Sequence, residues 1–231
     1  MCTVVIRVPE SADDDVRILA IRDEDPHRPW RPLGQWWPDR PGVTGVLDEL
    51  AGGAWLAHDD ERLAVLLNRE GGSTVAVPAS RGGLVLGSIA GDPLPDPLLT
   101  LGFNLVEADR GGVRITSWDG GVPRLTELAP GTHMIAHDDV DDPATPRVAA
   151  WLADFAAAST DGDRWWEEWV AVLRRTAEIG PEDDRAIIRD NRPHGYPTLT
   201  LLVCAATIGA TGVSATMATL DDPGAWNDVS L

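Results

Sequence analysis

The chain contains no lysine, so all 19 of its basic residues are arginines. This excludes enzymes that form a Schiff base on lysine, and it leaves arginine side chains and backbone amides to bind any anionic ligand. Cysteine is also scarce: the two that occur, Cys2 and Cys204, exclude a disulfide-stabilised scaffold. The longest apolar run, residues 199–210, is interrupted by threonine and glycine and is too short to cross a bilayer.

Basic residues are fewer than acidic residues. With 37 acidic and 19 basic residues, the chain has a formal net charge of −18, which argues against nucleic acid or an anionic membrane as a partner. Hydrophobic residues make up 43% of the 231 residues, so we expect a globular protein with a single domain over residues 1–231. The acidic segment 10–15 interrupts any signal-peptide pattern, and we therefore expect a cytoplasmic protein.

Tryptophan is the main aromatic residue: ten tryptophans accompany two phenylalanines and one tyrosine. Either tryptophan replaces other aromatic residues in the core, or some tryptophans form a flat apolar pocket for an acyl chain or a macrocycle. We expect Trp165, Trp166 and Trp169 to pack in the core or at an interface. Both interpretations stay open in the proline-rich segment 25–41. Trp30 and Trp55 are our candidate substrate-binding tryptophans.

Hydrophobic periodicity changes twice along the chain, from strands to helices and back. Alternating residues predict strands at 2–8, 16–21, 53–57, 62–68, 99–108, 112–118, 124–128, 133–137, 199–206 and 213–220. Helical spacing predicts helices at 81–90 and 147–158, and a third helix that is capped by Thr160 or Asp161 and runs to about Ile179. The prolines of 25–41 predict an irregular loop. Because the last strands are expected to rejoin the first sheet, we predict an α+β fold with two packed sheets and helices outside.

Cys2 is the first candidate for chemistry because it directly follows Met1. A small second residue usually permits removal of the initiator methionine, which would make Cys2 the N-terminal residue. It would then supply a thiol nucleophile and, in its own α-amine, a base with a pKa of about 7.7–8.0. The alternative is that Cys2 is a small apolar residue that opens a strand.

Three polar residues at predicted strand ends complete this candidate catalytic site. Asp23 could orient the α-ammonium group of Cys2, and Arg22 could lower the pKa of its thiol. The alternative for this pair is an ordinary salt bridge of a hairpin. Asn68 ends an apolar strand, where its amide could donate to an oxyanion; otherwise it is a turn-forming residue.

Several short motifs occur together with these candidates. They are Met1-Cys2, Arg22-Asp23-Glu24 with Arg28-Pro29, Gly53-Ala54-Trp55-Leu56, Leu67-Asn68, Gly102-Phe103-Asn104 and Pro130-Gly131-Thr132. In this order and spacing they resemble the NRDE family, whose members are similar to transport and Golgi organisation protein 2. The resemblance covers residues 1–137 well and residues 145–231 loosely.

The resemblance implies a four-layer αββα sandwich of two antiparallel sheets, similar to the N-terminal nucleophile hydrolases such as penicillin and bile-salt acylases. It implies Cys2 as nucleophile, Arg22 and Asp23 as its orienting pair, and Asn68 as oxyanion donor. The expected activity is a cysteine amidohydrolase that cleaves the C–N bond of a small acyl amide through a thioester and needs no cofactor. The alternative is a non-catalytic protein that binds and carries haem or an acyl-coenzyme A or other lipid in the same cleft.

The chain also departs from the pattern of the family that it resembles. Ile21 stands where the family has asparagine, and His137 stands where a second asparagine is expected after the fourth strand. A neutral histidine can still donate a hydrogen bond or ligate haem iron, so His137 and Asn104 are further substrate-binding candidates. Acidic residues follow His137, but their spacing is not that of a calcium loop, and we predict no metal site.

Overall fold

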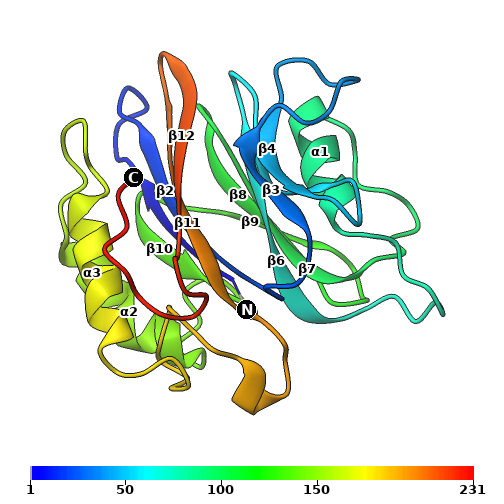
Figure 1. Cartoon of the computed structure of the whole chain (residues 1–231). Coiled ribbons are helices and arrows are strands. Elements are labelled where there is room, and N and C mark those ends of the chain that lie inside the picture. The colour runs from blue at the N-terminus through cyan, green and yellow to red at the C-terminus, as the bar shows by residue number, and fades with distance from the viewer. Residues whose placement is uncertain (1) are drawn as a thin grey trace.

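A computed structural model describes residues 2–231 as two antiparallel β-sheets packed face to face, with helices on both outer faces (Figure 1). The first sheet has the order β10 (Gly131–Ile135), β1 (Thr3–Val8), β2 (Val16–Glu24), β11 (Leu199–Gly209), β12 (Gly212–Thr219). The second has the order β3 (Trp30–Gly34), β4 (Thr44–Asp48), β5 (Ala54–His58), β6 (Leu63–Gly72), β7 (Leu101–Asp109), β8 (Gly112–Trp118), β9 (Arg124–Glu127).

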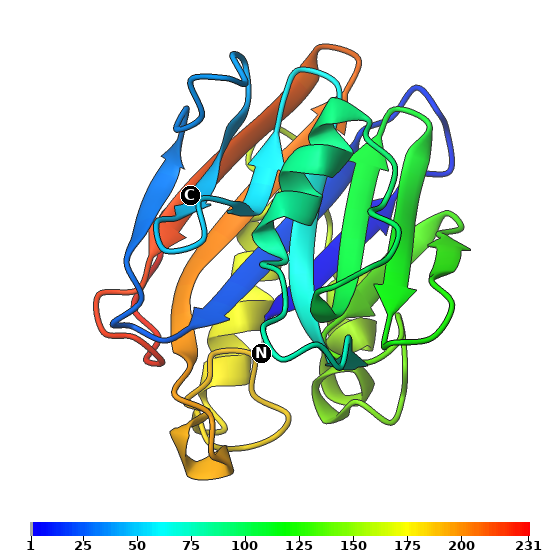
Figure 2. The same ribbon diagram turned by 90° about the vertical axis from the view of Figure 1, so that its right-hand side faces the viewer.

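Helices complete the predicted four layers. α2 (Pro146–Ala157) and α3 (Glu167–Ala177) cover the first sheet, and α1 (Gly82–Ala90) covers the second. Figure 2 shows α1 in front of the second sheet, where it contacts β5, β6 and β7. A short 3-10 helix, Arg192–His194, precedes β11. The αββα arrangement of an α+β fold is therefore confirmed. None of the helices in residues 2–231 is long and apolar enough to cross a bilayer.

Side-chain alternation explains the layering. Along β1, Val4 and Ile6 face the second sheet and Val5 faces the helices, because successive side chains of a strand point to opposite faces. Cys2 follows this alternation and lies on the side of Val4. The start of β1 therefore directs its side chains into the space between the two sheets.

The tryptophans of the helical region pack as predicted. Trp165 and Trp169 are buried, and their rings meet edge to face with centroids 5.5 Å apart. Phe155 of α2 packs on Trp169 in the same way at 5.8 Å. These aromatic contacts join α2 and α3 to the outer face of the first sheet.

Three details of the predicted secondary structure were wrong. Segment 25–41, predicted to be an irregular loop, contains the edge strand β3, and β4 was not predicted at all. Pro32 lacks an N–H group, and the β3–β4 register shifts between Arg31 and Gly34, so the strand has little alternation to recognise. The helix predicted to follow a cap at Thr160 or Asp161 begins only at Glu167, because Gly162 has a φ of +75° that a helix does not allow.

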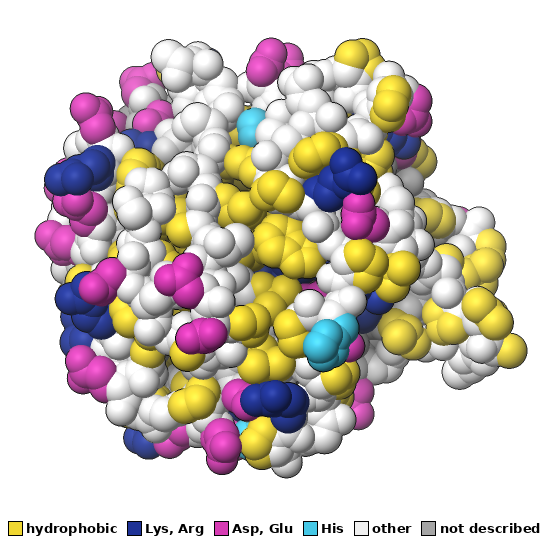
Figure 3. All heavy atoms as spheres, in the orientation of Figure 1, with side chains coloured by type: hydrophobic (Ala, Val, Ile, Leu, Met, Phe, Trp, Pro, Cys, Tyr) yellow, Lys and Arg dark blue, Asp and Glu magenta, His cyan; other side chains and the backbone are white. Residues whose placement is uncertain are grey.

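The two sheets do not join into a barrel, so the interior approaches the surface between their edge strands. Figure 3 shows hydrophobic side chains gathered in the middle of the face seen in Figure 1. Trp30 and Leu33 of β3 and Val213 and Met217 of β12 are partly buried and pack against the core between the sheets. Trp30 therefore belongs to the margin of the core between the sheets.

Candidate active site

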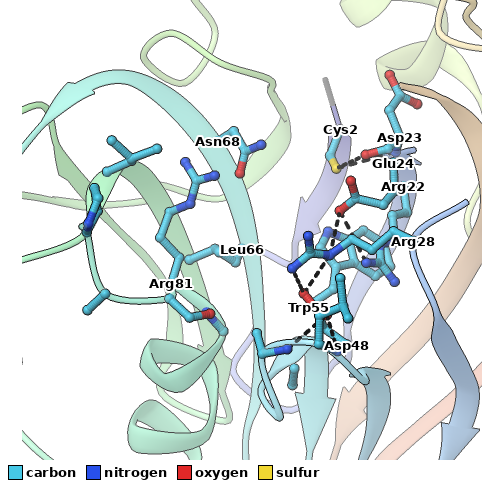
Figure 4. Close-up of a pocket in the computed structure, with 18 residues that line it drawn as sticks. Cys2, Arg22, Asp23, Glu24, Arg28, Asp48, Trp55, Leu66, Asn68 and Arg81 are labelled. Carbon is cyan, nitrogen blue, oxygen red and sulfur yellow. Dashed lines mark hydrogen bonds and ion pairs between the residues drawn. The ribbon is translucent and has the colours of Figure 1, made fainter. Parts of the chain in front are cut away.

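A cavity of about 500 Å³ opens where the ladder between β5 and β6 ends. The last paired residues are Leu56 and Val65, and beyond them the two strands separate. Trp55 of β5 and Asn68 of β6 line the opening from the second sheet, and Cys2 lines it from the first (Figure 4). Separation of the two strands thus provides room for a ligand beside the predicted nucleophile.

Cys2 is held against β2 by the main chain. Its side chain is 7% exposed, and the Asp23 amide N–H donates to Sγ over 3.4 Å while Sγ donates to the Asp23 carbonyl over 3.6 Å. Thr3 pairs with Ile21 in the β1–β2 ladder, which brings Cys2 alongside this strand end. Burial, and secondarily the negative charge of Asp23, raises the pKa of the Cys2 thiol. The sulfur therefore keeps its proton at neutral pH until a base removes it.

Arg22 points from β2 into the space between the sheets. Its guanidinium carbon lies 5.8 Å from the Trp55 ring centroid and 6.0 Å from that of Trp30, which is the geometry of cation–π contacts. Its Nη2 pairs with Glu24 at 3.4 Å. Its Nη1 is buried and has no hydrogen-bond partner among the described residues. The Arg22 charge is thus fixed beside Cys2 with hydrogen-bonding capacity left over.

Asp23 points to the opposite face of the same strand. Its carboxylate is buried, and it accepts hydrogen bonds from Thr200 Oγ1 at 2.6 Å and from Asn191 Nδ2 at 3.3 Å. The guanidinium of Arg147 is buried, and the negative charge of Asp23 raises its pKa against the effect of burial. Nη1 of Arg147 donates to Thr3 Oγ1 at 3.0 Å. The orientation of Asp23 is therefore fixed by residues far along the chain.

Sequence reasoning missed these three partners of Asp23. Thr200 lies in an apolar strand, and Asn191 and Arg147 occur in segments that resemble the family only loosely. The alternation of β2 does indicate that Arg22 and Asp23 face opposite ways. A carboxylate buried between the sheet and the helices requires polar partners, so the sequence did indicate that such partners exist.

Asn68 lies on the other wall of the cavity. It is exposed and sits just before the shift in the β6–β7 register between Asn68 and Gly72. Figure 4 shows Asn68 and Arg81 on one side of the cavity and Cys2 with Arg22 and Arg28 on the other. The amide of Asn68 can therefore meet a ligand that occupies the space next to the thiol.

Two further arginines line the cavity. Arg28 is fixed by Asp48, which accepts from its Nε at 2.9 Å and from its Nη2 at 2.6 Å. Arg81 donates from Nη1 to the Gly102 carbonyl at 2.9 Å. Burial lowers the pKa of Arg81. Neither arginine was predicted as a site residue, although Arg28 belongs to a motif quoted above.

The remaining predicted site residues do not line this cavity. Asn104 is buried, and its Nδ2 donates to the carbonyls of Ala136 and Asp138 at 3.3 and 2.8 Å, so it fixes the segment that follows β10. His137 lies in that segment with its Nε2 3.3 Å from a carboxylate oxygen of Asp138, and burial lowers its pKa. Trp30 contacts Arg22 from outside the cavity. The structure thus brings together Cys2, Arg22, Asp23, Asn68 and Trp55.

The acidic residues after His137 are engaged in protein contacts. Asp139 pairs with Arg69 at 2.7 Å, and Asp138 accepts from Thr145 Oγ1 at 2.7 Å. Asp141 accepts from His133 Nδ1 at 2.6 Å. Within residues 2–231, no group of three or more histidine, cysteine and acidic side chains is arranged to hold a metal ion.

The His133–Asp141 contact makes stability depend on pH. The hydrogen bond to Asp141 raises the pKa of His133, and burial opposes this rise in part. The contact therefore stabilises the fold fully at pH values below the pKa of histidine in the unfolded chain. This stabilisation is lost as the pH rises through the pKa of His133 in the folded protein. Between pH 6 and pH 9 we expect the wild type to lose about 1 kcal/mol of unfolding free energy more than His133→Gln does. Urea unfolding at the two pH values measures this, and equal losses in both proteins would contradict it.

The cavity wall also depends on two glycines that touch. A Cβ atom on Gly53 would lie 2.5 Å from the carbonyl carbon of Gly82, the first residue of α1. We expect Gly53→Ala to lower the free energy of unfolding by about 2 kcal/mol, because the start of α1 must move away from β5. Thermal unfolding followed by circular dichroism measures the change.

Gly83→Ala is the matched control for this substitution. A Cβ atom on Gly83 meets no atom within 4 Å. Alanine is also the better helix former, by about 0.5–1 kcal/mol. The control should therefore be neutral or stabilising. Similar destabilisation by both substitutions would show that the close approach of Gly53 and Gly82 is unimportant.

The family model of Transport and Golgi organisation 2 matches residues 1–196. The match takes in the cavity residues described above and extends through α2 and α3 to Asn191, beyond the part of the chain in which the motifs are clear. No curated protein matches the chain. On this match, the chain belongs to the Transport and Golgi organisation 2 family.

Proposed function

We propose that the protein is a cysteine amidohydrolase that cleaves a small acyl amide, with Cys2 as the nucleophile. The main support is that Cys2, which precedes β1, lines one cavity of about 500 Å³ together with Arg22 and Asp23 of β2 and Asn68 of β6. The proposal requires removal of Met1, which lies outside the described residues. Removal would free the α-amine of Cys2 to act as the catalytic base.

In the first step the α-amine takes the proton of the Cys2 thiol as the sulfur forms a bond to the amide carbonyl carbon. The electron pair of the carbonyl moves to oxygen, and the Nδ2–H of Asn68 stabilises the resulting oxyanion. Asp23, held by Thr200 and Asn191, orients the α-ammonium group. When the intermediate collapses, the C–N bond breaks and the leaving amine takes the proton from this ammonium, which leaves a thioester on Cys2.

In the second step water attacks the thioester. The α-amine accepts a proton from the water as the C–O bond forms, and collapse of the second oxyanion breaks the C–S bond. The proton returns to the sulfur, and the carboxylic acid leaves. The overall reaction consumes one amide and one water and gives one acid and one amine, so no cofactor is needed.

A non-catalytic carrier of an acyl-coenzyme A or another lipid is the second candidate. Two exposed apolar side chains, Leu50 at 67% and Leu101 at 44%, line the same cavity and suit an acyl chain. Haem is less well supported as cargo, because no histidine lines the cavity in the part of the chain that the structure describes.

Mass and thiol reactivity together test the enzymatic proposal. Intact-mass spectrometry of Cys204→Ala should show loss of one methionine. Iodoacetamide should then add one acetamide group per chain, faster at pH 7.5 than it alkylates N-acetylcysteine, because the α-amine removes the thiol proton. Retained methionine, or alkylation no faster than that of the free thiol, would overturn the proposal. Saturable quenching of tryptophan emission by a long-chain acyl-coenzyme A would then favour the carrier.

A further inference from the structure

Arg81 differs from the other cations of the cavity in having no carboxylate partner. Arg28 pairs with Asp48 and Arg22 pairs with Glu24, whereas Arg81 makes no ion pair with any residue in 2–231. Its recorded side-chain hydrogen bond is the one to the Gly102 carbonyl. A half-buried guanidinium that has no ion pair and feels a carboxylate, Glu24, only at longer range is poorly compensated for its lost hydration. An anion that reached it would therefore be bound favourably.

The start of α1 adds positive potential at the same wall. Arg81 is the N-cap residue of this nine-residue helix, and its own side chain makes no capping hydrogen bond. Ser80 Oγ accepts from the Gly82 N–H at 3.3 Å, and the first turn contains no acidic residue. Gly82 lines the cavity, and the space around Gly83 is open. The partial positive charge of the helix N-terminus therefore adds to that of Arg81.

A third and independent observation comes from the opposite wall. Arg22 has a side-chain exposure of 3%, and its Nη1 has no hydrogen-bond partner among the described residues. The Nε1 of Trp55 is likewise buried and has no hydrogen-bond partner within residues 2–231. Both side chains line the cavity. Buried donors are usually paired in folded proteins, so an acceptor oxygen of a ligand in this cavity would stabilise these two.

We infer that the cavity wall formed by Arg81 and the first turn of α1 binds an anionic group of the substrate, a carboxylate or a phosphate. This inference rests on the proposed function, in which the scissile carbonyl lies at Cys2. The substrate class is then an acyl amide with a negative charge on the part that faces Asn68 and Arg81 (Figure 4). Since the whole chain has a net charge of −18, attraction of an anion is a local property of this wall.

Two alkylating reagents of nearly equal shape test the inference in the mature Cys204→Ala protein. Iodoacetate and iodoacetamide both transfer a carbon to the Cys2 sulfur with loss of iodide, but only iodoacetate has a carboxylate. Arg81→Gln should lower the ratio of the iodoacetate to the iodoacetamide rate by about tenfold. Arg81→Lys should keep most of the ratio, because it keeps the charge.

Arg40→Gln is the matched control. Arg40 donates from Nη1 to the Leu86 carbonyl of α1 at 3.0 Å, as Arg81 does to Gly102, but it does not line the cavity. Its ratio should equal that of the parent. An unchanged ratio in Arg81→Gln, or an equal fall in Arg40→Gln, would overturn the inference.

Calorimetric titration with inorganic phosphate and with acetate keeps the two proposals separable. If Cys2 reacts with neither reagent, the enzymatic proposal fails, and saturable binding that Arg81→Gln abolishes and Arg40→Gln retains would still support the anion site. Binding of one ion and not the other identifies phosphate or carboxylate as the preferred group. Absence of binding by both ions, or binding that Arg81→Gln leaves intact, would remove the site.

Discussion

Replacement of Cys2 by alanine is expected to lower kcat/KM for cleavage of an acyl p-nitroanilide by about 10⁴-fold or more, since loss of a nucleophile removes the covalent route entirely. In the proposed enzyme the remaining cavity would still bind substrate through Arg22, Arg81 and Asn68, so KM should change much less than kcat. Release of p-nitroaniline, followed for a series of acyl chain lengths and with and without an anionic substituent, measures both constants.

Cys204→Ala is the control for this substitution. Cys204 lies in β11, is 1% exposed and belongs to the core between the sheets. Burial raises the pKa of the Cys204 thiol to about 12, so it does not act as a nucleophile at neutral pH. Its substitution should leave kcat/KM within about twofold of the wild-type value. Activity that survives in Cys2→Ala, or that falls equally in Cys204→Ala, would exclude Cys2 as the nucleophile.

Asp23→Asn is expected to lower the free energy of unfolding by about 3 kcal/mol, because it removes a negative charge beside a buried cation. Arg147 is 2% exposed, and burial lowers its pKa to about 10, an effect that the charge of Asp23 opposes. Asparagine keeps the shape of the side chain but leaves this guanidinium without that charge. Urea unfolding followed by tryptophan fluorescence measures the change. If the dependence of the unfolding free energy on urea concentration is unchanged, the substitution has not altered the unfolded state.

Asp154→Asn provides the comparison at the surface. Asp154 pairs with Arg175 at 2.7 Å, but their side chains are 40% and 46% exposed. Solvent screens such a pair, and its loss should cost less than about 1 kcal/mol. Equal effects of the two substitutions would mean that the carboxylate of Asp23 contributes no more than a surface charge, and the network described around it would have no energetic importance.

Much of the first sheet could be predicted because its strands have regular alternation. Residues 2–8 and 16–21 gave β1 and most of β2, and Cys2 and Arg22 could be placed on one sheet from these patterns alone. The edge strand β3 could not be predicted, because a strand with a proline and a register shift lacks the alternation by which strands are recognised. Strands were thus predicted correctly where burial of one face makes apolar and polar residues alternate, and they were missed where no such alternation occurs.

The motifs of the resemblance have structural causes that the sequence does not reveal. Gly53 is required by its contact with Gly82, 29 positions away along the chain. Asn104, predicted to bind substrate, holds two carbonyls of the segment after β10. The partners of Asp23 are separated from it by 168 and 177 positions. Contacts at such distances depend on how the sheets and helices assemble, and a single sequence contains no direct record of them.

The hydrogen bonds that hold Asp23 have a consequence for the order of events during synthesis of the protein. Thr200 belongs to β11, which pairs with β2, so the carboxylate is fixed only after the ribosome has released most of the chain. In the proposed enzyme, the aminopeptidase that removes Met1 acts on a nascent chain whose Cys2 is still accessible, before folding leaves that side chain 7% exposed. If the proposal holds, maturation of the amino terminus precedes assembly of the catalytic centre, and an incomplete polypeptide on the ribosome would be inactive.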